Sequence, residues 1–336
     1  MGIPNLLKRA ISVLLCILFV LPFASVNVSA LTLPSLSSPT ATFTIQPSGT
    51  GYYMGEAVGL PNDKTAVLVY QYPSWIYYVR IYDSSGNKIT DVNVSNLMTT
   101  KFSSEEYHLF GLANGNIVLT YNKSDSSVVG SNAAYFIVID QSGNRIVNET
   151  KINTYDGTLL NRWVSMAQLD NGNIAFAWQR GDNFSFATRV FTTSGSPVTA
   201  EILVETVNTR QISIAASTNG TYMVQYSYYV DGSGQNKSVY KIYNNDGTFS
   251  TSGVISTTTD STYTIALSNG NYLCMIGNFN TVGRILDPTG ATLQDNIPIG
   301  SSGRGNVAIV NTSGGEGFVA LSYDSDYLDA MNNSSN

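Results

Sequence analysis

The sequence contains a single histidine, His108, and only two cysteines, Cys16 and Cys274, among its 336 residues. This scarcity excludes a zinc site built from histidine and cysteine, a haem-attachment motif and a disulfide framework. We therefore expect no cofactor and no metal held by such ligands. Binding of a metal ion by other ligands inside the fold stays an open alternative. Cys274 lies in an apolar run, which predicts a buried and unreactive thiol.

Charged residues are also scarce, because they make up only 12% of the chain. This is about half the share that soluble domains usually have. The 23 acidic residues outnumber the 17 basic ones, and the formal net charge is −6. Nucleic acid and anionic lipid are excluded as partners, since both need a basic surface. Ser, Thr, Asn, Gly and Tyr are abundant instead, and this composition favours strands and turns over helices.

Residues 1–30 have the features of a secretory signal peptide. Lys8 and Arg9 precede an apolar run over residues 10–24, and Val28-Ser29-Ala30 offers a small-residue cleavage pattern. We expect cleavage after residue 30, although the pattern also allows a retained membrane anchor. No later stretch is long enough to cross a membrane. The mature chain is therefore predicted to be secreted or to lie on the extracellular surface.

A repeated unit organises the chain after residue 50. Turns with the sequence Asn-Gly recur about every 50 residues between apolar strands, at Asn114-Gly115, Asn171-Gly172, Asn219-Gly220 and Asn269-Gly270. A second turn with Gly at its fourth position follows in each unit, at residues 83–86, 140–143, 192–195, 244–247 and 287–290. We expect tight two-residue Asn-Gly hairpins, because both residues tolerate positive φ. Each unit then contains four antiparallel strands.

Four antiparallel strands in a repeat of this length predict one blade of a β-propeller. Asn62-Asp63 and Ser313-Gly314 resemble worn copies of the first turn at either end of the array, so we count six units. We predict an all-β, six-bladed β-propeller of four-stranded antiparallel blades. It forms a single domain over residues 41–336, after a flexible linker over residues 31–40. The last unit lacks its outer strand, which residues 41–45 at the start of the mature chain can supply. This N-terminal strand would close the last blade and remove two exposed sheet edges.

The repeats also resemble those of known proteins. Residues 112–121 (LANGNIVLTY) and 135–144 (YFIVIDQSGN) are similar to repeats of large secreted bacterial and archaeal surface proteins. The similarity extends over nearly all of residues 55–325, and it consists of turn chemistry and strand patterning. This resemblance implies a propeller fold and a cell-surface setting, and it transfers no catalytic residue.

Alignment of the units places equivalent residues in columns. An aromatic column on the second strand is expected to pack between blades rather than to hold a cofactor: Tyr70, Tyr121, Trp178 and Tyr226. A basic column on the third strand is expected to lie along apolar surface or to pair with a neighbouring blade: Arg80, Arg189, Lys241 and Arg284. Binding of an anionic ligand is the alternative use of these cations.

A polar column opens the innermost strand of each blade and forms the candidate ligand site. Its members are Glu56, His108, Ser165, Ser213 and Tyr263. We expect them at one mouth of the central channel, where convergent polar groups can bind a ligand. The alternative is that they are polar only because strands begin at the surface. Loops at the same face carry Trp75 and Trp163, whose rings can stack on sugars or belong to the core.

Catalysis has less support in the sequence than binding. His108 would have to serve any Ser-His-acid triad, and the Gly-x-Ser-x-Gly nucleophile motif is absent. Glu56 with Glu105 or Glu106 forms the best candidate pair of carboxylates for glycoside hydrolysis. No residue is assigned a catalytic role.

The sequence therefore predicts a secreted, monomeric binding or adhesion protein that recognises glycan or an extracellular protein through one face of the propeller. A secreted polysaccharide-acting enzyme, either a hydrolase or a lyase, is the first alternative, and a structural surface-coat subunit is the second. Asn-x-Ser/Thr sequons, among them Asn122 and Asn148, predict a glycoprotein if the host glycosylates.

Overall fold

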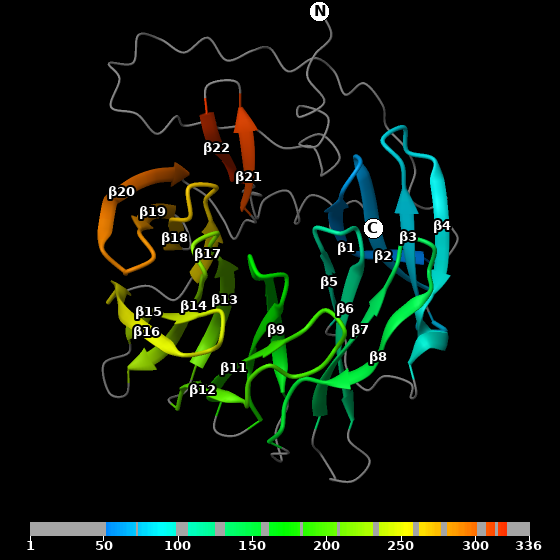
Figure 1. Cartoon of the computed structure of the whole chain (residues 1–336), viewed down its shortest axis with the longest axis horizontal. Coiled ribbons are helices and arrows are strands. Elements are labelled where there is room, and N and C mark those ends of the chain that lie inside the picture. The colour runs from blue at the N-terminus through cyan, green and yellow to red at the C-terminus, as the bar shows by residue number, and fades with distance from the viewer. Residues whose placement is uncertain are drawn as a thin grey trace, which may run out of the picture.

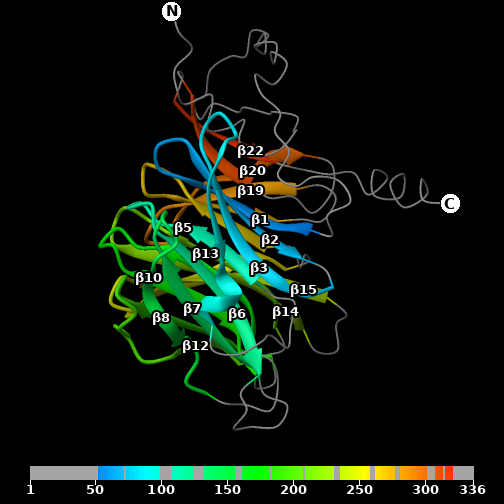
Figure 2. The same ribbon diagram turned by 90° about the vertical axis from the view of Figure 1, so that its right-hand side faces the viewer.

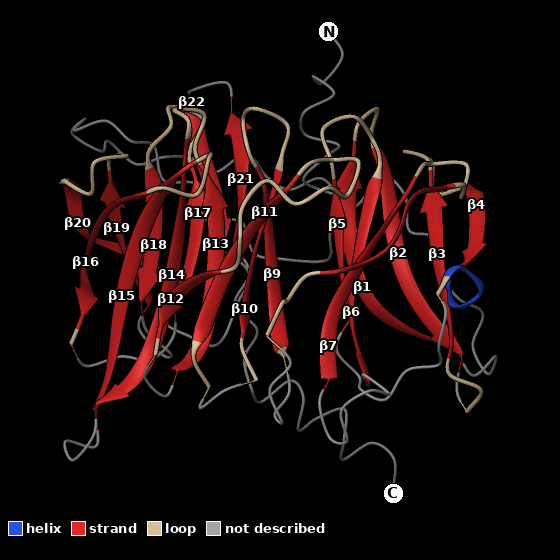
Figure 3. Ribbon diagram, turned by 60° about the horizontal axis from the view of Figure 1, so that its bottom comes forward, coloured by secondary structure: helices blue, strands red, loops and turns tan. Residues whose placement is uncertain are grey.

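The computed structural model describes residues 52–71, 73–98, 107–124, 132–155, 161–181, 184–206, 209–230, 235–257, 262–276, 281–300, 307–312 and 315–320. These residues form 22 strands and one short 3-10 helix, η1 (Val94–Leu97). Figure 3 shows how completely strands dominate this part of the chain. No helix among the described residues is long and apolar enough to span a bilayer.

The strands form five four-stranded antiparallel sheets and one two-stranded sheet. Sheet 1 contains β1 (Tyr52–Leu60), β2 (Lys64–Gln71), β3 (Ile76–Tyr82) and β4 (Lys88–Asn93). Sheet 2 contains β5 (Tyr107–Gly111), β6 (Ile117–Ser124), β7 (Asn132–Ile139) and β8 (Arg145–Lys151). Sheet 3 contains β9 (Arg162–Gln168), β10 (Ile174–Gln179), β11 (Phe186–Phe191) and β12 (Ile202–Glu205). Sheet 4 contains β13 (Thr209–Ala216), β14 (Thr221–Val230), β15 (Gln235–Asn244) and β16 (Phe249–Ser256). Sheet 5 contains β17 (Thr262–Ala266), β18 (Tyr272–Ile276), β19 (Thr281–Leu286) and β20 (Thr292–Gly300), and sheet 6 contains β21 (Val307–Thr312) and β22 (Gly315–Ala320).

The predicted all-β chain of four-stranded antiparallel units is confirmed for five units. The structure shows five complete sheets rather than the six expected, because the described part of the last unit contributes only β21 and β22. The strand expected at residues 41–45 lies outside the described residues, as do the signal segment and the linker.

The sheets follow one another in chain order around a common centre (Figure 1). The first strand of each sheet lies nearest that centre, and neighbouring first strands contact one another from β1 through β5, β9, β13 and β17 to β21. Figures 1 and 2 both place β21 and β22, in red, beside sheet 5. Radial sheets with their first strands innermost are the arrangement of a propeller.

The hydrophobic cores lie between neighbouring sheets. One core joins each consecutive pair from sheets 1 and 2 to sheets 4 and 5. Within these cores Tyr121, Trp178 and Tyr226 are buried, which confirms the packing predicted for the aromatic column. Burial of each such ring contributes about 1.5–3 kcal/mol, so these three rings help to hold sheets 1 to 4 against one another.

The basic column also joins neighbouring sheets, which is one of its predicted uses. Its cations donate to backbone carbonyls on or just after the fourth strand of the preceding sheet: Arg189 to Ile152 at 3.0 Å, Arg284 to Val254 at 3.1 Å, and Lys241 to Val204. Arg80 instead pairs with Asp91 of its own sheet, with Nε and Oδ1 3.3 Å apart.

The Asn-Gly turns form at the expected places but belong to another turn type. Only the glycines have positive φ, for example 86° at Gly115, while the asparagines before them do not. The N–H of Gly115 donates to the carbonyl of Leu112 at 2.8 Å, and Oδ1 of Asn114 accepts the N–H of Asn116 at 3.0 Å. The turn is therefore a longer loop that ends in a left-handed glycine. The side chain of the asparagine, rather than its backbone, stabilises it.

Candidate functional site

The antiparallel topology places two sets of loops at opposite rims of the sheets. The Asn-Gly turns join first to second strands and define the turn rim. The starts of the first strands, together with the loops between second and third strands, define the strand-start rim. Several first strands begin earlier than expected, since β1 starts at Tyr52 and β13 at Thr209. Glu56 and Ser213 consequently lie inside their strands.

Glu56 and His108 contact each other across neighbouring first strands. Nδ1 of His108 lies 2.7 Å from Oε1 of Glu56, and the N–H of Leu109 donates to Oε2 of Glu56, also at 2.7 Å. The pairing of β1 with β2 shifts between Met54 and Ala57, so Glu56 lies in a bulge, a feature common next to functional sites. The two side chains remain partly exposed, 38% for Glu56 and 33% for His108. The pair is thus held in place and accessible to a ligand.

The other members of the polar column lie on the remaining first strands. Ser213 is buried, and its Oγ accepts the N–H of Thr264 at 3.1 Å, which links β13 to β17. Ser165 lies half-buried on β9 opposite Ala177 of β10. Tyr263 is half-buried on β17, and burial raises the pKa of its hydroxyl. The structure therefore brings Glu56 together with His108, and it uses Ser213 in a separate contact between sheets.

Trp163 occupies a bulge near the start of β9. The pairing of β9 with β10 shifts between Ala177 and Gln179, which places an extra residue of β9 at this point. Trp163 has a φ of 55°, a conformation that bulky side chains rarely adopt. The guanidinium of Arg162 lies 4.2 Å from the centre of the Trp163 ring, and its Nε donates to Oε1 of Gln179 at 2.8 Å. The indole therefore lies against a fixed cation.

Two further groups, which the columns do not indicate, lie in or beside sheet 3. Phe184, in the loop between β10 and β11, has a φ of 60° and is 38% exposed. The guanidinium of Arg180 lies 4.0 Å from the ring centre of Tyr155, and its Nε is 2.8 Å from Oε1 of Glu201. These residues occur once in the chain rather than in every unit. The sequence signal for Phe184 was an aromatic residue in a loop between a second and a third strand.

Trp75 lies in the loop between β2 and β3. Its φ is 51°, and it is 45% exposed. The indole stacks on Tyr70, with ring centres 5.6 Å apart and planes 9° from parallel. Tyr70 contacts Tyr77 at 5.7 Å, and Tyr77 packs on Tyr107 at 4.0 Å. A row of rings thus leads from the exposed Trp75 to the residue before His108.

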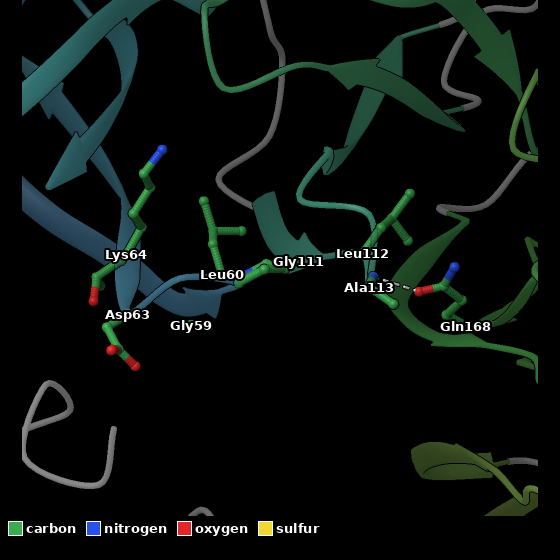
Figure 4. Close-up of a pocket in the computed structure, with 10 residues that line it drawn as sticks. Gly59, Leu60, Asp63, Lys64, Gly111, Leu112, Ala113 and Gln168 are labelled. Atoms are coloured by element: carbon green, nitrogen blue, oxygen red, sulfur yellow. Dashed lines mark hydrogen bonds between the residues drawn. The ribbon is translucent and has the colours of Figure 1, made fainter. Parts of the chain in front are cut away.

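A pocket of about 680 Å³ opens at the turn rim, which is the opposite rim. It is lined by the ends of the first strands of sheets 1 and 2 and by Gln168 of β9 (Figure 4). Oε1 of Gln168 accepts the N–H of Ala113 at 2.7 Å, and Nζ of Lys64 donates to Oε1 of Gln141 at 2.6 Å. Both contacts join neighbouring sheets. None of the candidate residues from the sequence lines this pocket.

Three further sequence expectations concern the cysteine, a possible metal site and the glycosylation sequons. Cys274 is buried, as predicted, and burial raises the pKa of its thiol to about 12. Among the described residues, no three His, Cys, Asp or Glu side chains gather as a metal ion would require. Of the two sequons named above, Asn148 is exposed, whereas Asn122 is buried on β6. Asn148 is the more accessible acceptor.

No protein-family model matches the chain, and no curated protein is significantly similar to it in sequence. Solved structures share the fold. An α-L-arabinanase from Penicillium chrysogenum, solved with arabinobiose, superposes with a TM-score of 0.54 at 12% identity, over 79% of this chain and 92% of that one. A GH93 α-L-arabinofuranosidase from Fusarium graminearum, also solved with arabinobiose, gives a TM-score of 0.51 at 11% identity, over 79% of this chain and 91% of that one. Identities this low establish the fold alone, which is of the β-propeller type.

Proposed function

We propose that this protein acts on a polysaccharide bound at the strand-start rim. The observation that carries the proposal is the contact between Glu56 and His108, a fixed and partly exposed pair with Oε1 and Nδ1 2.7 Å apart. Trp75 and Trp163 lie at the same rim, on sheets 1 and 3. A few convergent polar groups beside aromatic surfaces are typical of ligand sites.

The shared fold supports hydrolysis over adhesion. The two superposed proteins are an α-L-arabinanase and an α-L-arabinofuranosidase, and each was solved with arabinobiose. We therefore favour the enzymatic alternative, with an arabinose-containing polysaccharide as the first substrate to test. Recognition of the glycan without turnover is the second function that the same residues support.

Glu56 is positioned for a direct part in cleavage of a glycosidic bond. His108 and the backbone of Leu109 contact one oxygen each, which holds the carboxylate in a single orientation. A nucleophile or general base needs such positioning. Hydrolysis also requires a second carboxyl group to protonate the leaving oxygen. Glu105 and Glu106 precede β5 directly and are our candidates for it, although they lie outside the described residues.

Release of reducing ends from arabinan tests this function. We expect the wild-type protein to release sugar and the Glu56→Gln variant to lose about 100-fold or more of that activity. Asp295→Asn is the matched control, because it removes a carboxylate from the exposed ion pair with Arg284 on sheet 5, away from the rim. Binding of arabinan without release would favour recognition over hydrolysis. If the protein neither binds nor cleaves arabinan, xylan or pectin, the proposal is refuted.

We also propose that sheet 6 fills the position between sheets 5 and 1 and so completes a six-bladed ring. Along β2, Ala66 and Leu68 pack toward sheet 2, so the alternating Val67 and Val69 face the other way. These two side chains are buried, and so is Leu273 on the corresponding face of sheet 5. Buried apolar faces on both sides support a sheet between them. We further propose that the protein is secreted, because residues 1–30 have the features of a signal peptide, and that it is monomeric.

A further inference from the structure

Three large aromatic residues of the strand-start rim have a left-handed backbone. The values of φ are 51° at Trp75, 55° at Trp163 and 60° at Phe184. The other non-glycine residues with positive φ in the described chain are Asn62, Asp63 and Asn296. Asparagine and aspartate adopt this conformation readily, whereas bulky aromatic residues do so only under strain. The rim therefore holds its three aromatic residues in an unfavourable backbone conformation.

Burial in the core does not account for the strain at Trp75 and Phe184, and Trp163 is only half-buried. Trp75 is 45% exposed and Phe184 is 38% exposed, whereas a strained ring that served only the core would be covered. Trp75 places one face of its indole on Tyr70, and much of the remaining surface is open to solvent. An aromatic ring that is held by stacking and is nearly half exposed offers apolar surface on which a sugar can stack.

Local hydrogen bonds maintain the three conformations. The N–H of Trp75 donates to the carbonyl of Gln71 at 2.7 Å. The N–H of Arg180 donates to the carbonyl of Ser185, also at 2.7 Å, and closes the loop that carries Phe184. The side-chain bond from Arg162 to Gln179 fixes the residue before Trp163. Backbone strain that the surroundings maintain at exposed positions is typical of ligand-binding sites.

Arg162 adds hydrogen-bonding capacity beside two of these rings. Its guanidinium lies 4.2 Å from the ring centre of Trp163 and 5.9 Å from that of Phe184. A fixed guanidinium beside two rings suits a sugar, because a sugar presents a C–H face to the rings and hydroxyl oxygens to the cation. Trp75 belongs to sheet 1 and Trp163 to sheet 3, so the contact of Glu56 with His108 lies between them in ring order.

We propose that Trp75 forms one stacking subsite, and Trp163 with Phe184 a second, for a single sugar chain that crosses Glu56 and His108. The ligand is then an oligosaccharide of several sugars, bound through its interior rather than by one end. This inference rests on the proposed carbohydrate function. It adds to that function the length of the ligand and the residues that select for length.

Calorimetric titration of the full chain with arabinohexaose and with arabinobiose tests the inference. We expect the hexasaccharide to bind the wild-type protein at least about tenfold more tightly, and Trp75→Ala and Trp163→Ala each to weaken it about tenfold. Phe249→Ala is the matched control, because Phe249 is 57% exposed on β16 of sheet 4, with no left-handed backbone. Its affinity should equal that of the wild type.

The outcomes separate this inference from the function on which it rests. Equal affinity of the wild type and both tryptophan variants for the hexasaccharide overturns the two subsites and leaves the proposed function standing. Failure of the wild type to bind either sugar overturns both. Tighter binding of the disaccharide than of the hexasaccharide overturns the length requirement, and therefore this inference, but leaves the proposed function standing.

A second variant at Trp75 separates binding from folding. Glycine adopts a positive φ without strain and alanine does not, so Trp75→Gly should melt about 2 °C or more above Trp75→Ala. Both variants lack the ring, so both should bind the hexasaccharide about tenfold less tightly than the wild type. A glycine variant that binds as the wild type does would show that no sugar stacks on the ring.

Discussion

A carboxylate stabilises the second turn of several units. Oδ1 of Asp83 accepts the N–H groups of Ser85 and Asn87, both at 2.9 Å, and its Oδ2 accepts Nδ2 of Asn87 at 3.0 Å. The side-chain bond from Asn87, together with the backbone bonds, lowers the pKa of Asp83. A side-chain bond from Thr289 has the same effect on the pKa of Asp287 in sheet 5. The folded state therefore stabilises the ionised form of these carboxyl groups relative to the protonated form.

These turns predict a loss of stability in acid. A carboxyl group whose pKa is lower in the folded state stabilises the fold above its unfolded pKa, about 3.9, and loses this contribution as pH falls through the folded pKa. We expect Tm to fall below about pH 4. Asp83→Asn keeps an acceptor oxygen but cannot titrate, so its Tm should fall less than that of the wild type between about pH 5 and pH 3. Equal decreases would show that Asp83 contributes nothing to acid stability.

Single residues differ in how far the sequence predicts them. The buried aromatic column and Cys274 were predictable, because alternation along a strand determines which side chains face a neighbouring sheet. The left-handed backbone of Trp75, Trp163 and Phe184 was not, because no propensity places a bulky residue at positive φ. The contact of Glu56 with His108 was half predictable. The repeat aligned the two residues, and only the bulge in β1 shows why they meet.

At the scale of strands and sheets, third-strand cations tie sheets 3, 4 and 5 each to the sheet before it. Nη1 of Arg189 donates to the carbonyl of Ile152 at 3.0 Å, and its Nε donates to that of Thr199 at 3.1 Å. Hydrogen bonds from a charged group contribute more than neutral ones when they are partly buried. The same contact to the preceding sheet recurs at Lys241 and Arg284, which explains why this strand position is basic in sheets 3, 4 and 5. Arg80 of sheet 1 pairs with Asp91 of its own sheet instead.

Replacement of Arg189 by methionine measures the strength of this contact. Methionine keeps much of the packing and removes both donors, so we expect the free energy of unfolding to fall by about 2 kcal/mol. Lys88→Met is the control, since it removes an exposed ion pair with Asp91 at 2.7 Å and should cost less than about 1 kcal/mol. Denaturant unfolding compares the two variants. A loss no larger for Arg189→Met than for Lys88→Met would mean that the contact stabilises no more than a surface pair.

The strands were more predictable than their pairing. Turn residues punctuate the chain, so the number of strands per unit followed from Asn-Gly and the second turns. The bulges in β1 and β9 did not follow, because one extra residue changes the pairing without changing the residue types around it. Beyond its bulge β1 continues to pair with β2, from Tyr52 opposite Gln71. This continuation places Glu56 inside the strand rather than at its start.

At the scale of the whole molecule, stability resides in the interfaces between sheets. Each of the four cores from sheets 1 and 2 to sheets 4 and 5 draws side chains from two neighbours. A sheet removed from this arrangement would expose apolar surface on both of its neighbours. Val69 of sheet 1 and Leu273 of sheet 5 are also buried, on faces that point away from these four cores. If sheet 6 closes the ring as proposed, the stability of the whole molecule depends on that closing position too.

This dependence predicts a large effect of the segment over residues 41–45, which we expect to complete sheet 6. Apolar and polar residues alternate there, with Phe43 on the apolar face and Thr44 on the other. Phe43→Asp would bury a charge against the closing sheet, so we expect its Tm to fall by about 5 °C or more. Thr44→Asp carries the same charge on the face expected to meet water and should melt close to the wild type. If thermal unfolding followed by circular dichroism gives the same Tm for both variants, the ring is closed without this segment, and sheets 5 and 1 must be covered by other parts of the chain.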